Sequence, residues 1–361
     1  MATDLKRENY SATIDGKPVD LFTLRNGRGM VVRITNYGAK IEQVLVPDRD
    51  GVPGDVVQGY DGIEGAMGGQ ASMGSFIGRY CGRIPDGRFT LDGVAHRAAV
   101  NSPPNTLHGG QRGSRFRVFD ARQLDESSLE LTHLFEDGEE GFPGTLPLRL
   151  VYTVGDDNAL TIAWTAVAAD RTTIANFTDH TFFNLSGDLG SSILDHVATI
   201  HAGRYLALDD TGVPTGEMVD VAGTPHDFRT PAALGARIDA DDRMLALGKG
   251  YDLHYVTDRP ATGPVPVLQA RFLDPASGRT LEVLSTEPGL QLYTGNALEG
   301  KTPRDVGKGG TLYTKHSAFC AEPSKFPNAV NLPSLWPSFP STVLRPGQWT
   351  AGSIVYRFGV A

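Results

Sequence analysis

The amino-acid sequence predicts an all-β protein, built as one large antiparallel β-sandwich or barrel. Three observations predict this fold class: alternation with a period of two recurs along the chain, turn signals are frequent, and convincing helical periodicity is hard to find. Glycine (43) and proline (23) are spread along the 361 residues and do not gather in a linker. We therefore expect a single domain over residues 1–361, a length that large β folds can reach as one unit.

The clearest predicted strand pair lies in the middle of the chain. In LRLVYTV (148–154) and ALTIAWTAV (159–167), apolar side chains alternate with other residues, as in strands with one buried face. GDDN (155–158) supplies turn residues between them, so the sequence predicts a β-hairpin. Further strand-and-turn signals occur in RNGRG (25–29), LVPDRDGVPG (45–54) and RFTLDGVAHR (88–97).

One short helix is predicted at TPAALGARI (230–238). Thr230 can serve as its N-terminal cap, and Pro231 suits the first helical position. No internal repeat and no low-complexity segment interrupts the strand-rich pattern.

Composition and charge indicate an ordinary globular protein that does not bind nucleic acid. The chain is 40% hydrophobic and 21% charged, which is an ordinary globular mixture with ample material for a core. The formal net charge is −9 and no basic run stands out, so nucleic-acid binding is not expected.

The cysteines and the chain start predict where the protein resides. Cys81 and Cys320 cannot make a disulfide framework, which favours a reducing compartment. The polar stretch MATDLKRENYSATIDGKP lacks the apolar segment of a signal peptide. No apolar run approaches the roughly 20 residues that span a bilayer. We expect a soluble cytoplasmic protein without a membrane partner.

Common catalytic motifs are absent from the sequence. It contains no G-x-x-x-x-G-K-[ST] phosphate loop, no G-x-S-x-G elbow, no H-E-x-x-H and no C-x-x-C. An H-x-H pair of the kind that builds metal sites in β-barrels is also missing. Metal-dependent hydrolysis and nucleotide chemistry are therefore disfavoured, and we expect neither a metal nor a cofactor.

The stretch NFTDHTFFNL (176–185) places polar residues in strand-like sequence. If it is a strand, one face carries Asn176, Thr178, His180, Phe182 and Asn184. Such a face makes an unusual core but a sensible sugar-binding surface. The alternative is that His180 is a buried structural histidine, because histidine is intermediate in burial.

The stretch FCAEPSKFPNAVN (319–331) contains a carboxylate within an apolar strand pattern. With a period of two, Cys320 and Glu322 point the same way, and Pro323 is expected to end the strand. Glu322 is then either solvated at a strand end or held in a cleft. In a cleft, burial raises its pKa and hydrogen bonds lower it. Cys320 is expected to fill space, because no cationic helper is adjacent in sequence.

Three further polar residues can bind a ligand or have ordinary structural roles. His108 precedes two glycines in NTLHGG, which predicts a tight loop. Arg83 in GRYCGRIPDGRF is a fork-like donor for sugar hydroxyls or a partner in a surface ion pair. Asp252 and its neighbour Tyr251 in GYDL form a pair that can hydrogen-bond and stack a sugar; the alternative is that Asp252 belongs to a turn.

Taken together, these segments resemble the aldose 1-epimerases, also called galactose mutarotases. The order and spacing of that family are matched by NTLHGG, NFTDHTFFNLSG, GYD, EPGLQLYTGN and FCAEPSKFPNAVN. TNYGAKIEQVLVPDRDG near the start and LRPGQ near the end also look like the family, so the resemblance covers nearly the whole chain. It implies a large antiparallel β-supersandwich with few short helices and a sugar cleft across one sheet.

The resemblance also implies roles for individual residues. Glu322 matches the catalytic base of the family, His180 matches its general acid, and His108 matches its second active-site histidine. The residues that match sugar-binding or further cleft positions are Arg83, Asp252 and Gln291. The implied activity interconverts the α and β anomers of a free aldose, a glucose- or galactose-like hexose or a pentose, without a cofactor.

The sequence departs from the family at three places. Gly82 stands where the family commonly has asparagine, which removes an amide, leaves room and predicts a different preference among sugars. Pro323 and Ser324 replace a common Thr-Gln pair, and Asn328 replaces an aspartate after Pro327. The last two changes are expected to adjust a loop and not the chemistry.

Other sugar-related functions remain open from the residues alone. A glycoside hydrolase needs a second carboxylate beside Glu322, for which Asp252 or Glu287 are candidates. A non-catalytic carbohydrate-binding or sensing module needs no acid–base pair. An epimerase of phosphorylated hexoses needs a cationic cluster, which the sequence does not reveal. In each case the expected partner is a small sugar, and we expect a monomer or weak homodimer.

Overall fold

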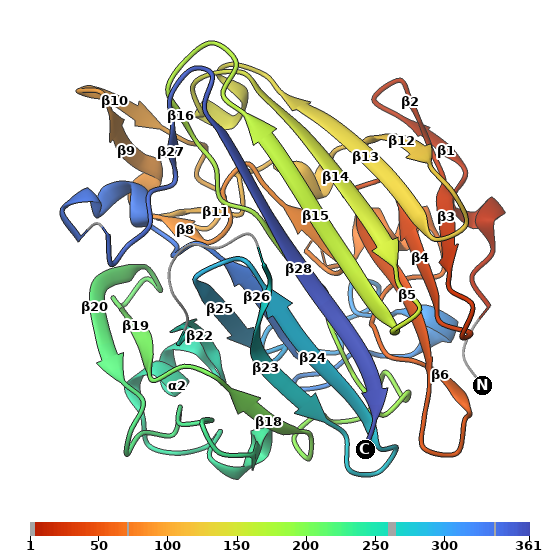
Figure 1. Ribbon diagram of the computed structural model, residues 1–361. Helices are drawn as coiled ribbons and strands as arrows, with labels where there is room; N and C mark the ends of the chain where they lie inside the picture. The colour runs from red at the N-terminus through yellow and green to blue at the C-terminus, as the bar shows by residue number, and fades with distance from the viewer. Residues whose placement is uncertain (1–3, 71, 259–264, 336) are drawn as a thin grey trace.

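The computed structural model describes residues 4–70, 72–258, 265–335 and 337–361. Antiparallel strands dominate it, as Figure 1 shows. Within the described ranges, the strands form a nine-stranded, a five-stranded and a four-stranded sheet, together with five two-stranded ladders. The prediction of an all-β fold is confirmed.

The nine-stranded sheet is the largest layer. In spatial order its strands are β12 (Asp120–Gln123), β13 (Ser128–Phe135), β14 (Leu146–Val154), β15 (Ala159–Val167), β28 (Trp349–Val360), β24 (Arg279–Ser285), β23 (Val267–Leu273), β18 (Val197–Ile200) and β21 (Ala232–Ala233). The strands of the five-stranded sheet are β20 (Pro214–Asp220), β19 (Arg204–Leu208), β22 (Asp252–Val256), β25 (Gly289–Tyr293) and β26 (Cys320–Ser324). The strands of the four-stranded sheet are β3 (Leu21–Arg25), β4 (Val31–Thr35), β5 (Lys40–Pro47) and β6 (Pro53–Asp55).

The remaining elements are short. The two-stranded ladders pair β1 (Ala12–Ile14) with β2 (Lys17–Val19), β9 (Arg88–Leu91) with β10 (Val94–Arg97), β8 (Arg83–Ile84) with β11 (Thr106–Leu107), β16 (Thr173–Ile174) with β27 (Val343–Leu344), and β7 (Ser75–Ile77) with β17 (Thr178–His180). The α-helices among the described residues are α1 (Ile63–Gly68) and α2 (Arg243–Gly248). None of the described helices is long and apolar enough to cross a membrane.

The predicted central hairpin is confirmed as β14 and β15. Leu150 lies opposite Trp164 and Tyr152 lies opposite Ile162, and these four side chains are buried. Residues 155–158 form the turn. The alternation that predicted the hairpin therefore also identifies the face that the nine-stranded sheet turns to the core.

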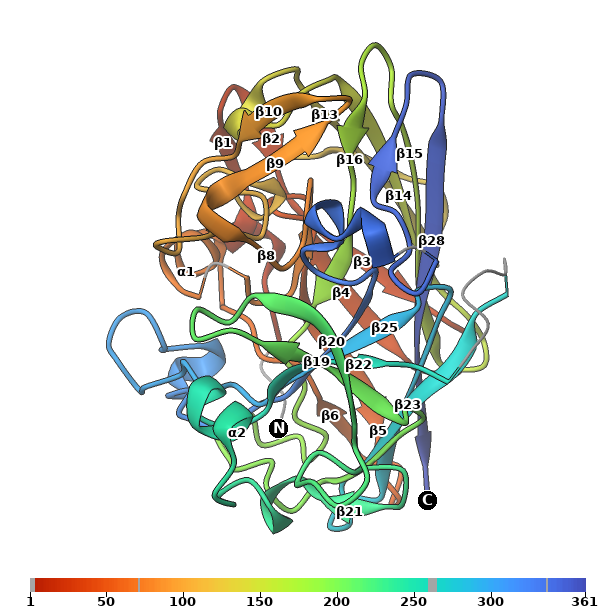
Figure 2. The same ribbon diagram turned by 90° about the vertical axis from the view of Figure 1, so that its left-hand side faces the viewer.

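The main core lies between the sheets. It is one connected cluster of buried side chains that draws on the nine-, five- and four-stranded sheets, with members such as Leu150, Ile162, Leu253, Leu292, Val32 and Ile34. Figure 2 shows the layers from the side, with β15 and β28 at the right edge and with β19, β20 and β22 to their left. The five-stranded sheet thus buries one face in the core and leaves the other face for a cleft.

The predicted helix at 230–238 is wrong. Its residues form strand β21 and a 3-10 turn, Leu234–Ala236. The amide of Leu234 donates to the carbonyl of His196, and the amide of Gly235 donates to that of Leu194. Hydrogen bonds to a distant segment therefore replace those of a helix. The intrinsic helix preference of this segment is also weak, because it contains Gly235.

A buried lysine joins a loop to two neighbouring strands. The Nζ of Lys308 lies 2.6 Å from the carboxylate of Asp55 and donates to the carbonyls of Glu42 and Val57 at 2.6 and 2.8 Å. The Lys308 side chain is 2% exposed. A buried charge of this kind is tolerated because all its donors have partners.

We expect Lys308→Met to lower the free energy of unfolding by about 3–5 kcal/mol, because the Asp55 carboxylate then stays buried without its cation. The matched control is Lys301→Met, since Lys301 pairs with Glu299 while its side chain is 66% exposed. The control should change the free energy by less than about 1 kcal/mol. Urea denaturation measures both, and equal effects would contradict this account of the buried pair.

Candidate functional site

Three neighbouring strands of the five-stranded sheet carry most of the polar residues of one cleft. In their register, His254 of β22 lies opposite Gln291 of β25, which lies opposite Glu322 of β26. Two residues along β22, Asp252 lies opposite Tyr293. Opposite residues of an antiparallel ladder project to the same side, so these side chains share the open face of the sheet.

The intervening residues point the other way. Leu253, Leu292 and Ala321 alternate with the polar residues and belong to the main core. The alternation anchors the strands on one face and presents functional groups on the other.

The cleft has a volume of about 600 Å³, within the usual range of small-molecule sites. Strand β17 adds His180, strand β8 adds Arg83, and His108 follows strand β11. Every site residue predicted from the sequence lines this cleft: Gly82, Arg83, His108, His180, Asp252, Gln291 and Glu322. Segments far apart in the sequence therefore meet at one place.

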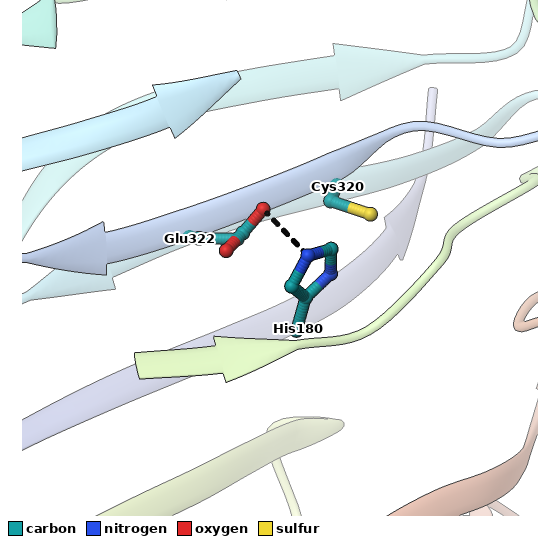
Figure 3. A group of neighbouring side chains, drawn as sticks. All are labelled: His180, Cys320 and Glu322. Atoms are coloured by element: carbon teal, nitrogen blue, oxygen red, sulfur yellow. Dashed lines mark ion pairs between the residues drawn. The ribbon is translucent and has the colours of Figure 1, made fainter. Parts of the chain in front are cut away.

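The carboxylate of Glu322 is held in the cleft and is not solvated at a strand end. Glu322 is 4% exposed, and a carboxylate oxygen lies 3.6 Å from the Nε2 of His180. Figure 3 shows the two side chains facing one another. Within the described part of the chain, no hydrogen bond to this carboxylate is found. Burial, and next the negative charges of Asp252 and Asp179, raise the pKa of Glu322 well above its ordinary value.

The ring of His180 is fixed by aromatic neighbours. It stacks on Phe182 with 5.2 Å between ring centroids and meets Tyr293 edge-on at 6.2 Å. Burial lowers the pKa of His180 to about 3, with a further contribution from the positive charges of Arg115 and Lys40. The free site therefore favours a neutral imidazole beside a protonated carboxyl group.

His108 sits in the tight loop that its two following glycines predict. Its φ is 53°, and Gly109 and Gly110 also have positive φ. The amide of Gly82 donates to the Nδ1 of His108 at 3.3 Å, so the proton of a neutral ring is on Nε2. Burial, and next the nearby His180, lower the pKa of His108 well below 6.5.

Arg83, Asp252 and Gln291 form a polar wall of the cleft. The Nε2 of Gln291 donates to the carboxylate of Asp252 at 2.7 Å. Burial raises the pKa of Asp252, although the charge of Arg83 and the Gln291 amide act in the opposite direction. The wall thus combines donors with an acceptor, which suits the hydroxyl groups of a sugar.

The prediction that strand β26 ends at Pro323 is wrong. It continues to Ser324, with Pro323 opposite Leu290 and Ser324 opposite Gly289. In the order of its sheet, β26 is an edge strand. A proline without an amide hydrogen is tolerated on such an edge.

The sequence analysis expected Gly82 to leave room in the cleft, and this expectation is wrong. Its φ is 77°, and a Cβ atom at this position would lie 2.5 Å from the Cβ of Pro327 and 2.8 Å from its Cγ. The ring of Pro327 therefore occupies the volume into which a side chain at position 82 would point.

The sequence did not single out several residues that line the cleft. His254 is buried between Gly289 and the ring of Phe326, and burial lowers its pKa to about 3. Lys249 and Lys315 bring positive charge to the cleft wall that the sequence did not reveal as a cluster. His254 follows Asp252 at the two-residue spacing of a strand, so this signal was available. The lysines carry no local signal, because only the fold brings them together.

The chain matches a known protein family over most of its length. The family model described as aldose 1-epimerase matches residues 20–357. The galactose mutarotase of Homo sapiens is 37% identical over 351 residues, which cover 96% of each chain. The aldose 1-epimerase of Escherichia coli (strain K12) is 33% identical over 344 residues, covering 95% of this chain and 96% of that one.

Solved structures share the fold. An aldose epimerase homologue from C. elegans has a TM-score of 0.84 at 28% identity, over 95% of this chain and 99% of that chain. The galactose 1-epimerase of Lactobacillus acidophilus has a TM-score of 0.82 at 26% identity, over 99% and 100%. The predicted antiparallel fold of the galactose mutarotase type is thereby confirmed.

The Gly82–Pro327 contact predicts a specific response to an added methyl group. A positive φ alone makes Gly→Ala unfavourable by about 1–2 kcal/mol, and the clash adds about 1–3 kcal/mol. The matched control is Gly93→Ala, because Gly93 has a φ of 81° and no atom lies within 4 Å of the place that its Cβ would take. We expect Gly82→Ala to destabilise the protein more than Gly93→Ala in urea denaturation.

The clash itself is tested with Pro327→Gly, which removes both the Cβ and the Cγ of Pro327 that an added methyl group would meet. Combined with Gly82→Ala, it should give a smaller loss than the sum of the two single changes, because the clashing atoms are then gone. Additive losses would show that the ring of Pro327 does not limit position 82.

Proposed function

The chain belongs to the aldose 1-epimerase family and is an isomerase acting on carbohydrates, and from this premise we propose that Glu322 and His180 interconvert the α and β anomers of a free aldose. The observation that carries the proposal is the buried pair itself, with 3.6 Å between the Glu322 carboxylate and the Nε2 of His180 at the wall of a sugar-sized cleft. The names of the relatives favour galactose as a substrate, and glucose or a pentose belongs to the same class.

The reaction needs one proton removed and one proton supplied. Glu322 takes the proton of the C1 hydroxyl while His180 gives a proton to the ring oxygen, so the C1–O5 bond breaks and an open-chain aldehyde forms. Rotation about the C1–C2 bond presents the other face of the aldehyde, and ring closure reverses both transfers. Each well-placed proton transfer contributes about 10²–10⁴-fold to the rate.

The proton count of the pair agrees with this cycle. The raised pKa of Glu322 and the lowered pKa of His180 leave one proton shared by the two groups. Movement of that proton from Glu322 to His180 gives the carboxylate base and the imidazolium acid together. Hydroxyl groups of a bound sugar favour this form, because they donate hydrogen bonds to a carboxylate that has none in the described structure.

The other cleft residues hold the sugar and stabilise the ring oxygen. His108 presents an Nε2 proton, since its Nδ1 accepts from Gly82, and it assists His180 at the ring oxygen. Arg83, Asp252 and Gln291 hold the distal hydroxyls while C1 turns. Fixed orientation of this kind is a major source of rate enhancement.

We expect Glu322→Gln to lower kcat for mutarotation by at least about 10²-fold, because an amide cannot accept the C1 proton. Sugar binding should persist, since the amide keeps the shape of the side chain. Polarimetry on freshly dissolved α-galactose and α-glucose measures the rate, and calorimetric titration measures binding. The control is Glu126→Gln, an exposed residue outside the cleft. A near-normal rate for Glu322→Gln would remove Glu322 from the role of base.

The pH profile tests the shared proton. His180 gains a second proton for the pair only near pH 3, so acidification through 6.5, the ordinary histidine pKa, should not lower kcat/KM. Activity should fall as the pH rises through the raised pKa of Glu322, because the pair then has no proton to give. The measurement is kcat/KM by polarimetry with the spontaneous rate subtracted. A loss of activity on acidification with an apparent pKa near 6.5 would contradict the assignment.

A further inference from the structure

Cys320 lies beside the proposed catalytic pair and has no part in the reaction. It comes from the same strand as Glu322 and faces the same side of the sheet. One ligand atom each from His180, Cys320 and Glu322 lie within 4.8 Å of one another, and all three residues are buried. Figure 3 shows the carboxylate, the imidazole and the thiol as neighbours.

The three groups are not engaged elsewhere. Among the described residues, the Glu322 carboxylate has the His180 contact at 3.6 Å, which exceeds a hydrogen bond, and the thiol of Cys320 is free of any disulfide. The nitrogen of His180 that faces this carboxylate is Nε2. Donor atoms that are buried and weakly engaged are available to a cation.

We propose that His180, Cys320 and Glu322 bind a thiophilic divalent cation such as Zn²⁺, and that the bound cation blocks the sugar site. The nitrogen, sulfur and oxygen donors are those that zinc takes in proteins. A thiolate and an imidazole select zinc or cadmium over Mg²⁺ and Ca²⁺, which prefer oxygen ligands.

The spacing suits a tetrahedral centre. Zinc lies about 2.0–2.3 Å from such donors, so neighbouring ligand atoms are roughly 3.3–3.8 Å apart in a tetrahedron. The His180–Glu322 separation of 3.6 Å already meets this requirement. The ligand atoms of the cluster lie within 4.8 Å of one another, so the widest pair has to close by at most about 1 Å to reach the same spacing.

The cleft supplies the route and the fourth ligand. His180 and Glu322 line the cleft, whereas Cys320 is fully buried behind them. A cation that enters from the cleft therefore meets three protein donors and keeps one open position for water. Binding forms a metal–sulfur bond and releases the thiol proton of Cys320, with that of a protonated Glu322 carboxyl, to solvent.

The expected consequence is inhibition by competition with the sugar. The cation takes the lone pairs of Glu322 and His180 that the reaction uses. This consequence depends on the proposed function, whereas the coordination itself depends only on the positions of the three side chains.

The experiment titrates Co²⁺, a spectroscopic substitute for zinc, into metal-free protein under a non-chelating reductant. A cobalt–thiolate charge-transfer band at one equivalent is expected in the wild type, and Zn²⁺ should abolish it. Cys320→Ala and Cys320→Ser should lose the band and bind Zn²⁺ more than about 100-fold more weakly than the wild type. A loss of this size exceeds the roughly 10–100-fold loss expected when a residue only supports a ligand by hydrogen bonding. Cys81→Ala is the matched control, because Cys81 is the other buried cysteine and lines the same cleft; it should keep the band.

Mutarotation assays give the second readout. Zn²⁺ should inhibit the wild type and Cys81→Ala, galactose should weaken this inhibition, and Mg²⁺ should have no effect. Absence of a thiolate band in the wild type, or its loss in Cys81→Ala, would overturn the metal site. A normal band with no inhibition by Zn²⁺ would overturn the blocking claim, whereas the roles proposed for Glu322 and His180 are tested separately by the mutarotation rate of Glu322→Gln.

Discussion

The common register of β22, β25 and β26 is the constraint on which the cleft depends. Opposite residues in these ladders point to the same side, so His254, Gln291 and Glu322 form one row across three strands. A slip of one residue would turn Glu322 toward the core and Ala321 toward the cleft. Burial of Leu253, Leu292 and Ala321 in the main core opposes such a slip. The apolar face of the sheet therefore fixes the chemistry of the polar face.

The proposed function depends on a second feature, the burial of Glu322 beside His180. Exclusion of water raises the pKa of the carboxyl and lowers that of the imidazole, so the two groups differ in the direction needed to share one proton. The same pair lacks strong hydrogen bonds to the rest of the described structure. Sugar hydroxyls can supply those bonds, and a thiophilic cation beside Cys320 can replace them. The proposed catalysis and the proposed metal inhibition would thus both follow from one buried, weakly bonded donor set.

Local sequence patterns predicted the features that local forces determine. A two-residue period identified the β14–β15 hairpin and the common face of Cys320 and Glu322, because strand geometry alone sets both. The ordered motifs of the family resemblance identified residues that the fold gathers in one cleft.

Long-range contacts decided the features that the sequence did not predict. The segment 230–238 bonds to a distant strand instead of forming a helix, Pro323 is accommodated because β26 lies at a sheet edge, and the space beside Gly82 is filled by Pro327. None of these partners is adjacent in sequence, so no local pattern could reveal them.

The orientation of a bound sugar tests the central claim most directly. A crystal structure with galactose in the cleft would place the C1 hydroxyl and the ring oxygen relative to the buried pair. The account predicts the C1 hydroxyl within about 2.6–3.2 Å of the Glu322 carboxylate and the ring oxygen at a similar distance from His180, with distal hydroxyls on Arg83 and Asp252. A sugar bound in the reverse direction, with C1 toward Lys249 and Lys315 and no contact between C1 and Glu322, would contradict it.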